Sequence, residues 1–454
     1  MKRTWRWPLA GFVVGGLIGA TFLTVNVVGA SGPEQRRAVN HSFGEILHTP
    51  PLILKQNEPV ELTFGVVCGL SEDRPEARCS PKGLVYLRAS GTGEFRALRL
   101  AREPNGQLSA EVPSRYTGGA GFDYYAEIED GRGYSATLPP GAAAAPQHAW
   151  IASNWTTVVL GSPRFGEARR PDSIVVRASW GKGDRALGLD SGREQSRIGP
   201  SAFDLAPDGA VVVLDQVNDR LAVYRHDARP RHLPIAFSGG EGDLAIAGDG
   251  TAYVLDAGGA GSSTPIVRSF DSAGQLIAGI PLAEPTADMV RAGPGGPLVH
   301  AYPSEMWLPT GRGRPPVVPS RQIALARPGR AVAGNLEVVV RASPGEARFA
   351  LVRGDRVVQA WIVKAPTSLG EVQLAEPYGN GLLAVVRLWT EKRAEFRVLQ
   401  LQPAGLTGSF AVDRAEWAET ASLSRFRLHG STLYQLRSAP SGVEIALFEI
   451  GGTT

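Results

Sequence analysis

The chain has 454 residues, a formal net charge of +3, 55 Gly and 34 Pro. A chain of this length can form two or three hydrophobic cores, and turn-forming residues at this frequency favour many short strands over long helices. Acidic and basic residues nearly balance, so the composition gives no reason to expect nucleic acid as a partner.

The N-terminal segment, residues 1–32, is typical of an export signal. Three basic residues within the first six positions precede an uncharged stretch, and the small residues of "VGA" form an acceptable cleavage site before Ser31. The uncharged stretch is also long enough to cross a bilayer. Two interpretations therefore stay open, a cleaved signal peptide and a retained signal-anchor. Both predict that the rest of the chain is extracytoplasmic, either secreted or held at the membrane by this segment alone.

Residues 33–50 are polar and irregular, and we expect a linker there. Residues 51–152 alternate apolar and polar side chains in runs separated by Gly, Pro, Asn and Asp, which is the pattern of an antiparallel β-sandwich. The run "GFDYYAEIEDGRGYSATLP" resembles the last hairpin of bacterial immunoglobulin-like or fibronectin-like modules, and this resemblance implies a spacer or docking module. Within the run, Tyr124 and Tyr125 should point to opposite faces of one strand, with one ring in the core.

The two cysteines both fall in this sandwich. Cys68 ends the run "VELTFGVVC", and Cys79 follows eleven residues later, beyond a polar loop. In an oxidising compartment outside the cytoplasm, we expect the pair to form a disulfide. Their spacing matches neither a C-x-x-C redox motif nor a zinc site.

Residues 153–172 are expected to form a second linker, followed by a β-propeller over 173–451. The run "SAFDLAPDGAVVVLDQVNDRLAVYR" at 201–225 predicts three strands joined by two tight turns. "GDLAIAGDGTAYVLDAG", from Gly242, repeats its first two strands, and weaker copies follow. A repeat of about 40 residues with about four short strands per unit is typical of a β-propeller, and the units count to six blades.

Residues 173–190 contain an alternating strand, "SIVVRA", that precedes the first complete unit and has no local partner. An open propeller would expose the edge strands of its terminal blades. We therefore expect this segment to pair with "LYQLRS" or "VEIALFEI" of the last unit and so to close the ring.

One repeat carries a specific family resemblance. The run "GPSAFDLAPDGAVVVLDQVNDRLAVYR" resembles an NHL-type repeat, matched by Pro200, Asp208, Gly209, Asp215, Asn218 and Arg220. The second copy keeps Asp249, Gly250 and Asp256 but lacks the Asn and the Arg. Beyond about 60 residues the resemblance rests on the period alone. It implies a propeller of the lactonase-like kind, whose six-bladed relatives include lactonases and lyases that hold a metal ion in the central channel.

Three acidic residues, Asp204, Asp243 and Asp288, occupy matching positions early in three successive repeats. If these positions lie on inner strands, the carboxylates could converge near the channel and bind Ca²⁺ or another divalent cation. The alternative is a structural role, in which such carboxylates cap turns or accept hydrogen bonds from backbone N–H groups of the next blade. No Glu, Asn or His set accompanies them at matching offsets, which favours the structural role.

The sequence contains no G-x-S-x-G elbow, H-E-x-x-H motif or P-loop. It therefore favours an exported, non-enzymatic interaction or scaffold protein without a cofactor. In this interpretation the propeller binds an unknown protein or cell-envelope ligand through its loops, and the sandwich is a spacer or docking module. The alternative is a metal-dependent enzyme of the lactonase or lyase kind that uses the propeller channel, where a cation would polarise a carbonyl or activate water.

Overall fold

The computed structural model describes residues 43–68, 79–91, 93–139, 141–192, 196–226, 228–237, 242–258, 264–282, 287–293, 295–301, 306–310, 337–418 and 425–451. The expected export signal over 1–32 lies outside these ranges. Within them the chain is all-β, as predicted, and its α-helical content is the single turn α1 (Ser114–Thr117). No helix of the described residues is long and apolar enough to span a bilayer.

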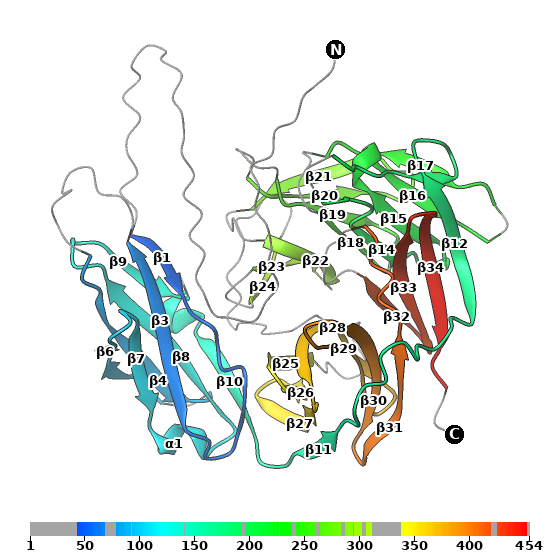
Figure 1. The fold of residues 1–454 in the computed structure, drawn as a ribbon. Helices are drawn as coiled ribbons and strands as arrows, with labels where there is room; N and C mark the ends of the chain where they lie inside the picture. The colour runs from blue at the N-terminus through cyan, green and yellow to red at the C-terminus, as the bar shows by residue number, and fades with distance from the viewer. Residues whose placement is uncertain are drawn as a thin grey trace, which may run out of the picture.

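The N-terminal part is a β-sandwich of two sheets (Figure 1). The first sheet has the order β1 (Gly44–Leu47), β3 (Val60–Cys68), β7 (Leu108–Val112) and β6 (Ala101–Arg102). The second has the order β2 (Ile53–Lys55), β10 (Gln147–Ala152), β8 (Gly121–Glu129), β4 (Lys82–Ala89) and β5 (Arg96–Arg99), with β9 (Ser135–Leu138) paired to β8.

The sandwich core follows the two-residue period of its strands. In β3, Val60, Leu62 and Phe64 are buried between the sheets, whereas Glu61 between them is exposed. Tyr124 is fully buried in the same core, as one of the two tyrosines was expected to be. Tyr125 points to the other face of β8, where it stacks on Tyr86 with 4.6 Å between ring centroids and is also buried.

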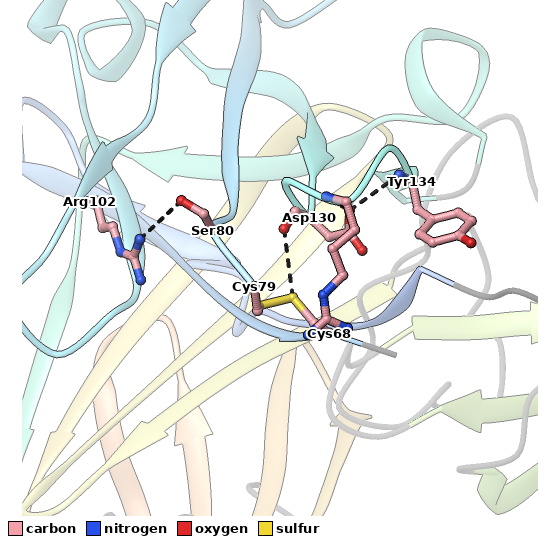
Figure 2. The surroundings of a disulfide bond; sticks show 7 residues. Cys68, Cys79, Ser80, Arg102, Asp130 and Tyr134 are labelled. Carbon is pink, nitrogen blue, oxygen red and sulfur yellow. Dashed lines mark hydrogen bonds between the residues drawn. A yellow bond between two sulfur atoms is a disulfide. The ribbon is translucent and has the colours of Figure 1, made fainter. Parts of the chain in front are cut away.

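The predicted disulfide between Cys68 and Cys79 is present, with 6.1 Å between the Cα atoms (Figure 2). It lies beside the turn between β8 and β9, because Cys68 Sγ is 4.0 Å from the backbone oxygen of Asp130. Asp130 Oδ1 accepts hydrogen bonds from the backbone N–H groups of Arg132 and Tyr134 and so fixes that turn. The disulfide thus joins the end of β3, in one sheet, to the chain that leads into β4, in the other.

Both expected linkers, 33–50 and 153–172, contain a strand, and the strand in 33–50 corrects the interpretation of that segment as irregular. In the first, β1 pairs antiparallel with β3. In the second, β11 (Thr156–Val159) pairs parallel with β27 (Arg356–Lys364). Four-residue strands show too little alternation to be recognised locally, and these two form because the edge of a longer strand offers them unpaired backbone groups.

Among the described residues the remaining strands form six sheets, whose inner strands follow one another in chain order. From the inner strand outward, the first three are β14 (Ala202–Leu205), β15 (Val211–Asp215), β16 (Arg220–Tyr224), β17 (Arg231–Pro234); β18 (Gly242–Ile246), β19 (Ala252–Asp256), β20 (Ile266–Phe270), β21 (Leu276–Pro281); and β22 (Ala287–Gly293), β23 (Gly296–Ala301), β24 (Met306–Pro309). The last three are β25 (Glu337–Ser343), β26 (Glu346–Arg353), β27, β11; β28 (Ser368–Tyr378), β29 (Gly381–Trp389), β30 (Ala394–Gln402), β31 (Gly405–Val412); and β32 (Phe426–His429), β33 (Thr432–Ala439), β34 (Gly442–Glu449), β12 (Ser173–Trp180), β13 (Ala186–Leu187).

The inner strands of these sheets contact one another around a centre, which makes this part of the chain a β-propeller (Figure 1). Contacts join β14 to β18, β18 to β22, β25 to β28, β28 to β32, and β32 back to β14. The predicted closure of the ring is confirmed: β12 pairs antiparallel with β34, with Arg177 opposite Glu444 and Ala178 opposite Val443. A sheet built from both ends of the propeller sequence therefore holds the ring together.

The sandwich and the propeller share a hydrophobic core. Leu52, Ile53, Trp150 and Ala152 of the sandwich pack with Val339, Ala350, Val352 and Ala360 of the β25–β27 sheet. The Trp150 indole N–H donates to the Gly354 carbonyl over 3.0 Å. Arg348 of β26 makes a two-pronged ion pair with Glu58 of the sandwich, at 2.7 and 2.8 Å. These contacts hold the two parts in one orientation instead of leaving them on a flexible tether.

Candidate functional site

The three predicted carboxylates lie on the first strands of successive sheets, as the repeat indicated. Asp204 is on β14 and Asp243 on β18, and both are buried. Asp288 is on β22, where the pairing with β23 shifts between Ala287 and Met289, and its side chain is 38% exposed. The register shift turns Asp288 out of phase with the other two carboxylates.

The two buried carboxylates fasten each sheet to the next. Asp204 Oδ2 accepts a hydrogen bond from the backbone N–H of Ile246 over 2.8 Å, and Asp243 Oδ2 accepts one from Val290 over 2.9 Å. Asp243 precedes Ile246 by three residues, and the residue three before Val290 is Ala287. The equivalent position of the third sheet therefore holds an alanine. Asp204 and Asp243 make the contact that the structural alternative describes.

A buried arginine that the sequence analysis did not single out lies between these two carboxylates. Arg427 of β32 places Nε 3.6 Å from Asp204 Oδ1 and Nη2 3.6 Å from Asp243 Oδ1. Its Nη2 also donates to the carbonyl oxygen of Leu244 over 3.2 Å. Arg291 of β22 adds a second cation, because its Nη1 donates to Asp243 Oδ2 over 2.8 Å. We call Asp204, Asp243, Arg291 and Arg427 the inner charge network.

The inner charge network is formally neutral, with two carboxylates and two guanidinium groups. Burial, reinforced by Arg291, lowers the pKa of Arg427, and Asp204 and Asp243 oppose that shift. A guanidinium still keeps its proton at physiological pH. Buried charges persist in proteins when they are paired and hydrogen-bonded in this way. The chemistry available here is the pairing of opposite charges across four sheets, from β14, β18, β22 and β32.

The structure does not bring Asp204, Asp243 and Asp288 together as a group of ligands. In the part of the chain that the structure describes, no three His, Cys, Asp or Glu side chains are placed to hold a metal ion. A cation at Asp204 and Asp243 would lie beside the guanidinium of Arg427 and would be repelled by it. The metal-binding role of the three residues stays a prediction, without a ligand group among the described residues.

Asp288 has a different partner, which sequence reasoning also missed. His300 of β23 is buried, and its Nδ1 lies 2.7 Å from Asp288 Oδ1. The two residues lie on adjacent strands of one sheet, twelve residues apart in sequence. A carboxylate in this position orients the imidazole ring. The available signal in the sequence was the alternation of residues on the two strands of a hairpin, but a single His is only a weak indication of a functional site.

The residues that match the NHL pattern join the first sheet to residues 173–190, the segment that closes the ring. Asp215 is fully buried, and its Oδ2 accepts hydrogen bonds from Asn218 and Arg220, each at 2.8 Å. Its Oδ1 accepts the backbone N–H of Gly188, and Arg220 Nη2 donates to the carbonyl of Ala186 over 2.7 Å. These contacts therefore join the first sheet to residues 186–188, in addition to fixing the turn after β15.

The second repeat lacks the Asn and the Arg but keeps the charge pair by another route. Asp256 accepts a hydrogen bond from Arg268 Nη1 of β20 over 2.6 Å. Both cations lie on the third strand of their sheet, Arg220 at the first residue of β16 and Arg268 at the third residue of β20. The second repeat therefore keeps an ion pair to its aspartate without the motif's two polar residues.

No family model matches the chain, and no curated protein matches it. Among solved structures, virginiamycin B lyase from Staphylococcus aureus is 11% identical with a TM-score of 0.36, and the match covers 58% of this chain and 98% of that one. A functionally unknown protein from Desulfotomaculum acetoxidans is 14% identical with a TM-score of 0.37, covering 59% and 88%. The PQQ-bound aldose sugar dehydrogenase from Streptomyces coelicolor is 12% identical with a TM-score of 0.33, covering 62% and 97%.

Proposed function

We propose that this protein is an exported, non-enzymatic interaction protein, which binds a protein or another ligand of the cell envelope through the surface of one rigid body. In this proposal the sandwich is an immunoglobulin-like module, the propeller has six blades of the NHL type, and no cofactor takes part. The N-terminal segment directs export and is either removed before Ser31 or kept as the sole membrane anchor. The basic start and uncharged stretch of 1–32 and the Cys68–Cys79 disulfide support export.

The observation that carries the proposal is the position of Arg427. In a channel-metal enzyme, the carboxylates of the inner strands face a bound cation. Here Asp204 and Asp243 face a guanidinium and accept backbone N–H groups of the next sheet. Their charge is used to assemble the ring, and this leaves the loops and outer strands as the surface available for function.

The shared core of sandwich and propeller supports the same role. A partner that contacts both parts meets a surface whose geometry is already fixed, so little conformational entropy is lost on binding. The Arg348–Glu58 ion pair and the Trp150 contact with Gly354 fix that geometry. We therefore assign the sandwich a docking role in which its orientation matters, and not the role of a loose spacer.

The test is cross-linking of the full chain in its native cell envelope, followed by rebinding of the captured species to purified protein. The proposal expects a saturable complex that the variant Arg348→Gln weakens and the exposed-site control Arg356→Gln leaves unchanged. Intact-mass measurement of the exported chain shows whether it begins near Ser31.

The enzyme alternative predicts a different result. Calcium would raise the unfolding temperature, EDTA would lower it, and Asp288→Asn would abolish the response without removing either inter-sheet hydrogen bond of Asp204 and Asp243. Hydrolysis of a lactone that depends on Asp288 would overturn the non-enzymatic proposal.

A further inference from the structure

The outer face of the second sandwich sheet, which points away from the sandwich core, carries a cluster of aromatic side chains. Tyr86 of β4 is half-buried, and Tyr125 of β8 lies directly opposite it. Phe95 packs edge-on against the Tyr125 ring, with 5.0 Å between centroids. Leu84, two residues before Tyr86 on the same face, is 37% exposed. The solvent side of an antiparallel sheet is usually polar, so these apolar side chains indicate a binding surface.

The Tyr86 ring is stacked on one face. It lies parallel to the Tyr125 ring within 5°, and the 4.6 Å between centroids matches the spacing of neighbouring strands, so both rings stand upright on the sheet. On the other side of Tyr86, the residue directly opposite is Ala97 of β5, which is exposed. A methyl group is too short to cover an upright aromatic ring. The second face of Tyr86 therefore borders an open space above Ala97, which we call the slot.

The slot lies at the uncovered end of a face that the propeller covers elsewhere. At β10, the side chains of Trp150 and Ala152 on this face join the core shared with the propeller. Among the described residues, β5 is the edge strand of the sheet, so the slot is open on the side away from Tyr86. A ligand in the slot would thus extend an interface that the sandwich already makes on this face.

Two polar groups flank the slot with opposite hydrogen-bonding roles. Leu84 lies between Arg99 and Glu127 in the neighbouring row of the sheet, about 7 Å along the strands from the row of Tyr86. The Tyr86 hydroxyl donates to Glu127 Oε2 over 2.9 Å, which leaves Glu127 Oε1 able to accept. The exposed Arg99 guanidinium makes no hydrogen bond with another described residue. A donor and an acceptor whose charges cancel suit a neutral ligand with hydroxyl groups, which both donate and accept.

The other charged side chains on this face of β4 and β8 are already paired. Arg88 is 2.9 Å from Asp123, and Lys82 is 3.1 Å from Glu129. Charge complementarity therefore favours an uncharged ligand over an acidic or a basic one. A sugar ring has apolar C–H faces that can stack on Tyr86, with hydroxyl groups around its edge for the flanking polar groups. An aromatic side chain of a protein partner would use the ring of Tyr86 alone.

We propose that the slot binds a sugar ring of a neutral oligosaccharide, which stacks on the free face of Tyr86 and makes hydrogen bonds with Arg99 and Glu127. A chain of sugars fits better than a single sugar, because the slot opens at the edge of the sheet and Leu84 extends the apolar surface beside it. The inference rests on the docking role proposed above for the sandwich and names its ligand class. Its experiment uses purified components, so it can fail while cross-linking in the cell envelope succeeds.

Calorimetric titration of the purified full chain tests the proposal with three probes: a β-1,4-linked tetramer of glucose, the corresponding tetramer of N-acetylglucosamine, and N-acetyltyrosine amide. Saturable binding of at least one tetramer is the expected result. Binding of N-acetyltyrosine amide and of neither tetramer would overturn the proposal and assign the slot to an aromatic side chain of a protein partner. Binding of none of the three probes would overturn it as well.

Variants of the slot locate the binding. Ala97→Ile fills the slot with an aliphatic side chain and should weaken binding of the tetramer about tenfold or more. Ala101→Ile makes the same change at an exposed position of β6, the edge strand of the other sheet, and should bind like the wild type. Equal binding by Ala97→Ile and the wild type would overturn the proposal.

Variants of Tyr86 test the stacking itself. Tyr86→Phe keeps the ring and should bind within about threefold of the wild type, whereas Tyr86→Ala removes the ring and should lose about tenfold or more. Undiminished binding by folded Tyr86→Ala protein would refute the stacking. If Tyr86→Ala does not fold, Ala97→Ile decides the matter, because its substitution is at an exposed position.

Discussion

The buried His48 makes the stability of the sandwich depend on pH. Its ring is stacked on Phe64 with 4.4 Å between centroids, and its Nδ1 and Nε2 lie 2.7 Å from the Thr63 carbonyl oxygen and from Tyr124 Oη. Burial lowers its pKa from 6.5 to about 4, although the Thr63 hydrogen bond acts in the opposite direction. Folding therefore requires a neutral imidazole, which donates from Nδ1 to Thr63 and accepts at Nε2 from Tyr124.

The sign and size of the effect follow from proton linkage. Because the folded pKa lies below the unfolded pKa, the unfolded chain binds more protons between pH 6.5 and 4, and stability falls as the pH falls through that window. The full contribution, about 3 kcal/mol, is present above pH 6.5, and about 2 kcal/mol of it is lost by pH 5. Urea unfolding of the full chain at a series of pH values from 7.5 to about 5 measures the loss.

A matched pair of variants isolates His48 from other titrating groups. His48→Gln keeps a donor and an acceptor but cannot be protonated, so its stability should depend less on pH, by about 2 kcal/mol at pH 5. His429→Gln removes an exposed histidine of β32 and should keep the wild-type slope. Equal slopes for wild type and His48→Gln would refute the idea that burial keeps His48 neutral.

Three further predictions concern other links in the fold. Reduction of Cys68–Cys79, which are eleven residues apart, should lower sandwich stability by about 3 kcal/mol in denaturant, and two reactive thiols in unreduced exported protein would contradict the bridge. Val176 of β12 is 2% exposed, so Val176→Asp should lower the free energy of unfolding by more than about 4 kcal/mol and yield aggregated protein. Val175→Asp, at the neighbouring exposed position, should stay soluble. Soluble Val176→Asp protein that unfolds cooperatively would mean that β12 does not close the ring. Arg427→Met should cost about 3–5 kcal/mol in thermal or urea unfolding, because it leaves buried carboxylates without their shared cation, and a neutral effect would contradict the pairing.

Much of the propeller could be predicted because its signals are local and repeated. The turn "PDG" before β15 requires a residue with positive φ, and Gly209 has φ +81° there. The strand over 173–190 had no local partner, and an open ring would expose the edges of its terminal sheets, so ring closure with the last unit could be predicted. The strands β1 and β11 were missed because each is only four residues long and forms against the edge of a longer strand. In the case of β11 that longer strand, β27, is also distant in sequence.

The candidate site was predicted only as far as the repeat extends. Placing Asp204 and Asp243 on inner strands was correct, because equivalent positions of a repeat share one geometry. In the sequence, Asp288 looked equivalent to Asp204 and Asp243, but the register shift in β22 displaces it by one residue. No local sequence pattern predicts such a shift. A signal for Arg427 existed in "RFRLH", where Arg425 and Arg427 alternate with apolar residues in a segment whose first four residues are buried.

Arg427 also links charge pairing to ring closure. Asp204 and Asp243 gain this guanidinium only after β32, near the end of the chain, packs against β14 near the beginning of the propeller. Before that contact forms, two carboxylates would have to lose water without one of their cations, which opposes burial. The sheet of β12 and β34 joins the same two ends of the chain. Closure of the backbone and neutralisation of the centre are therefore one event, made from contacts far apart in sequence, and folding should be slow and highly cooperative. Carboxylates repeated at matching positions therefore have a structural role here that is separate from catalysis, because Asp204 and Asp243 accept backbone hydrogen bonds from the next sheet.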